Sequence, residues 1–436
     1  MTTPRRLPSR SVPDSTPASV TPLAPVPPDG RSPDGRPAEA PVFRTRPKSL
    51  TAPDLVDSII QMALARRTSD IHFEPTESGM TVRFRVDGLL QLAEQIPLEA
   101  RAAVISRIKI MGNLDISEHR LPQDGRIKIR QKHQSVDIRI STLPSLYGEK
   151  VVMRLLDLDK VALPLTGTGL GREHLTEMTR LIRRPQGVIF VTGPTGSGKT
   201  STLYACLNDI ISETINIVTI EDPIEYEMTG MTQIGVNDRV GLTFASSLRS
   251  VLRQDPDVIL VGEVRDVETA RIAMQASLTG HLVFASLHTN DAVGAITRLL
   301  DMEIPPYLIA SSMIAVLAQR LVRVLCPVCK VEAPVEDDVR AMLDLPGDTR
   351  FARAPGCDFC HGAGAAGRTA IFELLTVTPT LRSLITSRAS EAQLREAARA
   401  AGTTSMFEDG MRKVLAGTVA YEELLRVAEP DHPQGG

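Results

Sequence analysis

Residues 188–200, VIFVTGPTGSGKT, decide the fold that we predict for this chain. Four apolar residues lead into residues 193–200, which match the pattern G-x-x-x-x-G-K-[ST]. Residues 201–211 continue as a helical stretch. Because a strand, a glycine-rich turn and a helix in this order form a phosphate-binding loop, we expect an α/β core built around this turn.

The residue types in the turn suit a nucleoside triphosphate. Glycines let the backbone curl until its N–H groups converge on phosphate oxygens, and the following helix adds the positive end of its dipole. Lys199 supplies a cation for the β- and γ-phosphates, and Thr200 supplies a hydroxyl for Mg²⁺. We therefore predict that ATP and Mg²⁺ bind here, through Gly193, Pro194, Thr195, Gly196, Ser197, Gly198, Lys199, Thr200 and Ser201.

Three polar side chains follow other apolar runs, namely Glu221, Glu263 and His288. The carboxyl ends of parallel strands meet at one edge of a sheet, so we expect these side chains near the phosphate-binding loop. Glu263 is the residue that we predict to polarise the attacking water, with organisation of Mg²⁺ as a close alternative. Simpler interpretations are a helix cap for Glu263, a solvating loop for Glu221 and a hydrogen-bonded core or turn histidine for His288.

The apolar runs also predict the layout of the core. They cover residues 187–191, 215–220, 258–261 and 281–286, with helical segments between them. Runs of this kind with helical crossovers indicate a parallel sheet that is covered on both faces.

A different pattern precedes this core. Residues 81–87, 126–130 and 135–141 alternate between apolar and polar side chains, which indicates half-buried strands. Residues 54–67 and 98–111 have helical spacing. We divide the chain into a disordered Pro-rich leader (1–52), a mixed α/β domain (53–157), a linker (158–171), the core (172–325), a cysteine-bearing subdomain (326–365) and a C-terminal helical subdomain (366–436).

Composition narrows the class of partner. The formal net charge is −3 and aromatic residues make up 3% of the 436 residues. A basic field and aromatic stacking surfaces are what nucleic-acid binding needs, so we expect no nucleic-acid partner.

No apolar run reaches the roughly 18 residues of a membrane span. The nearest, 307–326, is interrupted by polar and charged residues, and we interpret it as an amphipathic helix. With no signal peptide at the N-terminus either, we predict a cytoplasmic protein.

Four of the five cysteines form two C-x-x-C pairs: Cys326 with Cys329, and Cys357 with Cys360. Each pair places two thiolates on one side of a tight turn, and two such turns complete a tetrahedral shell. We predict a structural Zn²⁺ site, with reduced thiols that have lost the metal as the alternative. Cys206 is interpreted as a small buried apolar residue.

Together these blocks resemble the secretion ATPases of type II secretion and type IV pilus assembly. The resemblance extends from about residue 54 to the C-terminus, and individual blocks are less specific than their order. It rests on GPTGSGKT (193–200), TIEDPIEYE (219–227), GLTFASSLRSVLRQDPDVILVGEVRD (241–266), TGHLVFASLHTNDAVGAITRLLDM (279–302), VLAQRLVRVLC (316–326), SDIHFEP (69–75), VRFRVDGLL (82–90), LPQDGR (121–126) and DIRISTLPSLYGEKVVMRLL (137–156).

The resemblance implies an architecture and roles for particular residues. It implies a homo-hexamer with nucleotide sites between subunits, a PAS-like first domain and a RecA-like core. Glu221 would lie in the aspartate box, Glu263 in the Walker B motif, and His281 or His288 in the histidine box of the family. Arg126 and Arg139 are candidates for arginine fingers that reach a neighbouring subunit's γ-phosphate, with a solvated basic face as the alternative. Arg249 and Arg253 are further candidates.

The leading interpretation is a hexameric motor ATPase of type II secretion. It would associate with the inner membrane through an inner-membrane platform protein and the cytoplasmic domain of a membrane-anchored secretion or pilus component. Many family members carry a folded N-terminal docking domain, where this sequence has about 50 Pro-rich residues. Alternatives are a motor for type IV pilus extension or DNA uptake, a RecA-like nucleic-acid translocase, and a non-hydrolysing regulatory paralogue.

Overall fold

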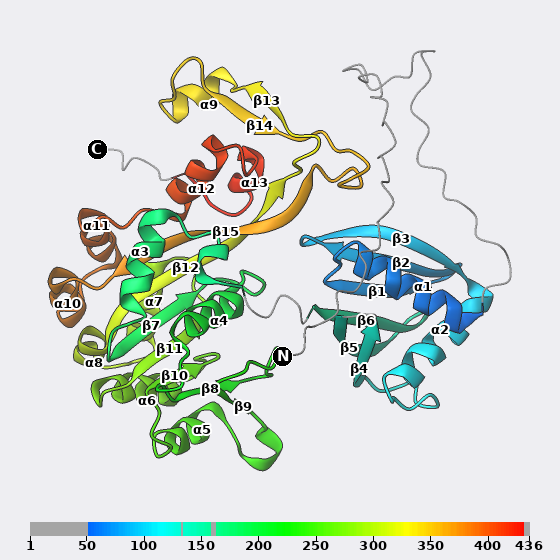
Figure 1. Ribbon diagram of the computed structural model, residues 1–436, viewed down its shortest axis with the longest axis horizontal. Coiled ribbons are helices and arrows are strands. Elements are labelled where there is room, and N and C mark those ends of the chain that lie inside the picture. Colours follow the sequence, from blue (N-terminus) through cyan, green and yellow to red (C-terminus); the bar gives the residue numbers. More distant parts are fainter. Residues whose placement is uncertain (1–50, 132–133, 158–162, 431–436) are drawn as a thin grey trace, which may run out of the picture. The chain divides into compact units, whose positions relative to one another are not determined.

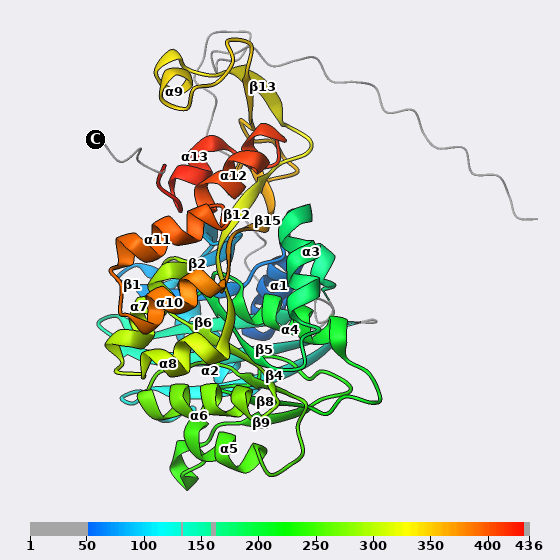
Figure 2. The same ribbon diagram turned by 90° about the vertical axis from the view of Figure 1, so that its left-hand side faces the viewer.

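A computed structural model describes residues 51–131, 134–157 and 163–430 of the chain. The predicted Pro-rich leader lies outside the described residues, apart from its last two positions. The predicted linker lies partly outside them. Figure 1 and Figure 2 show two folded parts, one before residue 158 and one after residue 162.

The first part contains an antiparallel sheet of order β3-β2-β1-β6-β5-β4. Its strands are β1 (Asp70–Thr76), β2 (Gly79–Val86), β3 (Leu89–Pro97), β4 (Gln123–Gln131), β5 (Gln134–Ser145) and β6 (Gly148–Asp157). The helices α1 (Ala52–Ala65) and α2 (Leu98–Met111) complete a core in which Ile59, Phe73 and Phe84 are buried. Alternation in the sequence predicted β2 and the β4–β5 hairpin, and both helical stretches are confirmed.

The second part is built on a sheet of order β15-β12-β7-β11-β10-β8-β9. β15 pairs antiparallel with β12, and the other neighbours are parallel. The strands are β7 (Gly187–Thr192), β8 (Ile217–Glu221), β9 (Thr232–Gly235), β10 (Val258–Val261), β11 (Leu282–Leu287), β12 (Met313–Leu325) and β15 (Ala365–Thr376). The parallel strands expected from the four apolar runs are therefore confirmed as β7, β8, β10 and β11.

Helices cover both faces of this sheet, and successive strand residues pack into opposite layers. Phe190 and Val261 pack with the layer of α5–α8, while Val191 and Leu260 pack with α3 and α4. The helical segments of this part are η2 (Leu165–Gly167), α3 (Arg172–Leu181), α4 (Lys199–Ile210), η3 (Asp238–Val240), α5 (Phe244–Val251), α6 (Val267–Leu278), α7 (Ala292–Asp301) and α8 (Pro306–Ser312).

The amphipathic helix predicted for residues 307–326 is wrong over most of its length. The helix α8 ends at Ser312, and residues from Met313 onward form β12 between β7 and β15. A strand that is buried on both faces has no alternating pattern, so an apolar run of this kind cannot be distinguished from a buried helix by periodicity. Its polar residues, which suggested one face of a helix, have specific partners in the structure.

A small two-stranded sheet and a group of helices complete the second part. The small sheet pairs β13 (Val331–Pro334) with β14 (Arg350–Arg353), and α9 (Asp337–Met342) lies between them in sequence. The C-terminal helices are α10 (Pro379–Thr386), α11 (Glu391–Ala400), α12 (Met406–Leu415) and α13 (Tyr421–Leu425). The boundary predicted at residue 366 remains a prediction, and β15 joins the sheet of the core. Within the described residues, no helix has both the length and the apolar composition needed to cross a membrane.

Candidate nucleotide site and tetracysteine centre

The glycine-rich turn connects the buried strand β7 with α4. Gly193, Gly196 and Gly198 have φ values of 149°, 79° and 89°, a region that L side chains seldom adopt. Gly198 is the N-cap of α4, so the first helical N–H groups have no partner within the helix. This turn therefore presents backbone donors and the positive helix end in one place, an arrangement that suits an anion.

Lys199 is folded back over the turn. Its Nζ donates hydrogen bonds to the carbonyl oxygens of Gly193 at 2.8 Å and Pro194 at 3.2 Å. Burial lowers the pKa of Lys199, and the nearby carboxylate of Glu263 opposes this effect. A partly buried ammonium group that donates to two carbonyl oxygens can exchange these contacts for phosphate oxygens.

The strand order places the predicted polar residues along one edge of the sheet. β7, β11, β10 and β8 are consecutive neighbours and parallel, so the turn, His288, Glu263 and Glu221 follow one another at their carboxyl ends. The His281 alternative is separated from this edge, because His281 precedes β11 and its Nδ1 lies 2.8 Å from the carbonyl oxygen of Ala276.

Glu263 is a partly exposed carboxylate whose charge interacts with that of Lys199 in the turn. Its side chain is 22% exposed, with Oε2 2.6 Å from Arg265 and Oε1 3.0 Å from Nε2 of His288. The hydrogen bond from Arg265 lowers the pKa of Glu263 more than burial raises it. The group is therefore an ionised, partly accessible carboxylate at neutral pH.

Glu221 has a different environment. It is buried, and its carboxylate accepts hydrogen bonds from Tyr204, from Thr219 at 2.6 Å and from Gln233 at 3.1 Å. Tyr204 belongs to α4, so this network ties the strand β8 to the helix that begins in the phosphate-binding turn. Tyr204 and Gln233 were not predicted from sequence, because an apolar helix and a short edge strand give no local signal of a buried polar network.

A second network holds the loop that carries His288. The hydroxyl of Thr192, the last residue of β7, accepts from the N–H of Thr289 at 2.8 Å and lies 2.7 Å from its hydroxyl. Arg320 of β12 donates to Asn290 at 3.1 Å. These contacts connect the loop after β11 to the neighbouring strand β7 and to β12, the next strand beyond it. None of them was predicted from the sequence.

The predicted arginine fingers contact residues of their own chain. Arg126 forms an ion pair with Asp137 within the β4–β5 hairpin, at 2.7 Å from Nε to Oδ1. Arg139 donates to the carbonyl oxygen of Ile224 at 2.8 Å and lies 3.1 Å from Glu225. Arg249 pairs with Glu268, and Arg253 donates to the carbonyl oxygen of Arg249.

The four predicted zinc ligands come together. The Sγ atoms of Cys326, Cys329, Cys357 and Cys360 lie within 4.8 Å of one another, with contacts of 3.8 Å and 3.9 Å. A tetrahedron with zinc–sulfur bonds of about 2.3 Å requires sulfurs about 3.8 Å apart. The N–H groups of Cys357 and Gly364 donate to the sulfur of Cys360, each at 3.2 Å, as expected for a thiolate. The residues therefore fit a closed Cys₄ zinc site.

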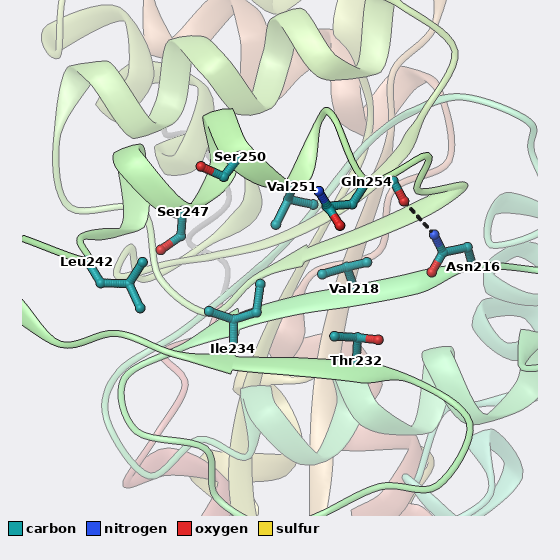
Figure 3. Close-up of a pocket in the computed structure, with 9 residues that line it drawn as sticks. All are labelled: Asn216, Val218, Thr232, Ile234, Leu242, Ser247, Ser250, Val251 and Gln254. Atoms are coloured by element: carbon teal, nitrogen blue, oxygen red, sulfur yellow. Dashed lines mark hydrogen bonds between the residues drawn. The ribbon is translucent and has the colours of Figure 1, made fainter.

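A separate pocket of about 390 Å³ lies between α5 and the strands β8 and β9 (Figure 3). Ser247, Ser250 and Val251 of α5 form one wall, and Val218 of β8 lies in the other. At one end Asn216 donates to the carbonyl oxygen of Gln254 at 2.9 Å. None of the lining residues belongs to the phosphate-binding turn, so this pocket is distinct from the nucleotide site.

Comparisons with known proteins show the family of the chain. A family model described as type II/IV secretion system protein matches residues 48–426. Type II secretion system protein HxcR of Pseudomonas aeruginosa is 51% identical over 373 residues, covering 86% of this chain and 76% of that protein. Type II secretion system ATPase E of Vibrio cholerae is 49% identical over 377 residues, covering 86% and 75%.

Solved structures show the same fold. The pilus retraction motor PilT with bound ADP has a TM-score of 0.59 and 24% identity, over 88% of this chain and 98% of that chain. The ATPase DotB of Legionella pneumophila has a TM-score of 0.64 and 20% identity, over 88% and 97%. At these identities the likeness concerns the fold alone, which is an α/β fold with a P-loop core and C-terminal helices.

Proposed function

The chain belongs to the type II/IV secretion system protein family, and from this premise we propose that it is the motor that drives pseudopilus assembly and protein export by a type II secretion system. It is a secretion ATPase that converts ATP and water into ADP and phosphate. The relatives that are about half identical to it are named for type II secretion, which favours this role over pilus extension.

One observation carries the catalytic part of the proposal: the phosphate-binding turn after β7 and Glu263 after β10 lie at the same edge of the sheet. The N–H groups of the turn and Lys199 would hold the phosphates of ATP. Thr200 would hold Mg²⁺, which neutralises charge on the β- and γ-phosphates when bound. Glu263 would accept a proton from the attacking water, and His288 would orient that carboxylate.

We assign supporting roles to three other residues. Glu221, with its hydrogen bonds to Tyr204 and two further donors, fixes the end of β8 against α4. Arg126 and Arg139 would leave their present partners to stabilise charge on a neighbouring subunit's ATP. This requires an assembly of several copies, which we propose to be a homo-hexamer.

The proposed setting follows from the family. The motor would act in the cytoplasm, peripheral to the inner membrane, through the platform protein and the cytoplasmic domain of a membrane-anchored secretion component. The Cys₄ centre would hold Zn²⁺ in a structural role, because four thiolates leave no open coordination position.

The direct test is Lys199→Ala in purified protein. We expect ATP turnover to fall at least about 100-fold, because the cation for the β- and γ-phosphates is removed. Arg271→Ala is the matched control, since it removes an exposed cation from α6 of the same core. Turnover that Lys199→Ala leaves unchanged would refute the assignment of the turn.

The type II role is tested in the organism that carries the gene. A chromosomal Lys199→Ala change is expected to stop export of type II substrates while pilus-dependent motility continues. Loss of pili with normal export would instead identify a pilus-extension motor.

A further inference from the structure

Gln319 is a buried amide whose neighbours on the same face of β12 are apolar. It is 1% exposed, and Ala315, Leu317 and Leu321, which point to the same face of the strand, pack in the apolar layer beside α4. A buried polar side chain is costly unless it makes a hydrogen bond. Oε1 of Gln319 has no hydrogen-bond partner among the described residues, so the group that accepts from its amide nitrogen is a clue to its role.

That group lies in the phosphate-binding turn. Nε2 of Gln319 donates to the carbonyl oxygen of Ser197 at 2.8 Å. Gln319 lies close to both the first and the last glycine of the turn. A Cβ on Gly193 would lie 2.4 Å from the backbone oxygen of Gln319, and a Cβ on Gly198 would lie 3.2 Å from its Nε2. Gln319 thus occupies the space that side chains at these two glycines would need.

This hydrogen bond fixes the orientation of one peptide group. The carbonyl of Ser197 and the N–H of Gly198 belong to the same peptide unit, and in a planar trans peptide they point in opposite directions. A carbonyl held toward β12 therefore directs the N–H of Gly198 away from β12, toward the mouth of the turn where phosphate oxygens would lie.

We infer that Gln319 is a positioning residue that preorganises the phosphate-binding turn by holding the Ser197 carbonyl. It acts through the backbone and does not touch the nucleotide. This inference rests on the proposed nucleotide site, and it predicts that loss of the amide weakens nucleotide binding without unfolding the chain.

The test compares Gln319→Met with Leu321→Met in the full-length protein. Gln319→Met keeps length and volume but removes the donor, while Leu321→Met changes the same face of the same strand without removing a hydrogen bond. We expect Gln319→Met to raise the dissociation constant for ADP and the KM for ATP about five- to tenfold, with kcat changed less than about twofold. Loss of one buried hydrogen bond should lower its melting temperature without nucleotide by only a few degrees, so the chain stays folded, while the added stabilisation by ADP should shrink relative to Leu321→Met.

Gln319→Asn is the second variant, because it keeps the amide but is one methylene too short to reach Ser197. It should weaken ADP binding to a similar extent. If Gln319→Met does not fold, the ADP affinity of Gln319→Asn tests whether Gln319 positions the turn. ADP affinity within about twofold of wild type in the folded variant, or a loss of kcat with unchanged affinity, would overturn the inference. Lys199→Ala separates the two claims: if it abolishes turnover while Gln319→Met behaves as wild type, the nucleotide site stands and only the role of Gln319 fails.

Discussion

Nε2 of His288 lies 3.0 Å from Oε1 of Glu263, across the carboxyl ends of the neighbouring strands β11 and β10. Arg265 contacts the other carboxylate oxygen at 2.6 Å. The carboxylate is thus fixed in orientation from both sides and its pKa is lowered, chiefly by the hydrogen bond from Arg265. An oriented, ionised carboxylate beside a phosphate-binding turn is suited to act as a general base.

Replacement of Glu263 by Gln should separate binding from hydrolysis. The amide keeps the size of the side chain but cannot accept a proton from water, so kcat is expected to fall at least about 100-fold while ATP binding is retained. Single-turnover measurements with labelled ATP would show bound, uncleaved nucleotide. Glu268→Gln, which changes an exposed carboxylate of α6, is the control. Near-normal turnover in Glu263→Gln would indicate that another residue acts as the general base.

Much of this site was predictable from sequence because its residues stand at the ends of apolar runs. The turn, Glu263 and His288 were each identified by their position after a strand, and parallel strands bring such positions to one edge. The strand order places His288, and not His281, at this edge, and that order depends on long-range packing. No local pattern in the sequence contains it.

The contacts that support the site were not predictable in the same way. Gln319 and Arg320 were interpreted as interruptions of a helix, because an apolar run buried on both faces carries no period. Tyr204 and Thr192 give no sign in the sequence of their polar partners in the structure. Such residues are found only when segments far apart in sequence are brought together.

The buried network around Glu221 predicts a structural effect of Tyr204→Phe. The hydroxyl of Tyr204 donates to Glu221, and burial together with that carboxylate raises the pKa of the phenol above its usual range. We expect the free energy of unfolding to fall by about 1–2 kcal/mol with kcat changed less than about threefold. Tyr226→Phe, on the ring that packs edge-on against Tyr204, is the control. A large loss of kcat with unchanged stability would instead indicate that this network takes part in catalysis.

Glu423 predicts a pH-dependent contribution to stability. Burial raises its pKa, but hydrogen bonds from Arg426 and Arg323 outweigh this effect and lower the pKa from the ordinary 4.5 to about 2. The folded-state pKa is the lower one, so the stabilisation is fully present above pH 4.5 and is lost as the pH falls toward 2. Glu423→Gln should therefore cost about 3 kcal/mol at pH 7.

Urea unfolding at several pH values measures this contribution. The difference between wild type and Glu423→Gln should narrow steadily below pH 4.5, the ordinary pKa of the carboxyl group. Glu422→Gln changes the adjacent exposed carboxylate and should have little effect at any pH. An equal loss of stability from Glu423→Gln at neutral and acidic pH would show that packing, rather than charge, explains its cost.

The tetracysteine centre gives a prediction that does not depend on ATP. Sulfurs 3.8–3.9 Å apart suit tetrahedral zinc, so the purified chain should contain about one zinc ion, and Cys357→Ser should lose it. Cys326 directly follows β12, so metal loss should also lower the melting temperature of the core. Cys206→Ala removes a buried thiol of α4 and should retain the zinc. A metal content that Cys357→Ser leaves unchanged would show that the ion binds elsewhere.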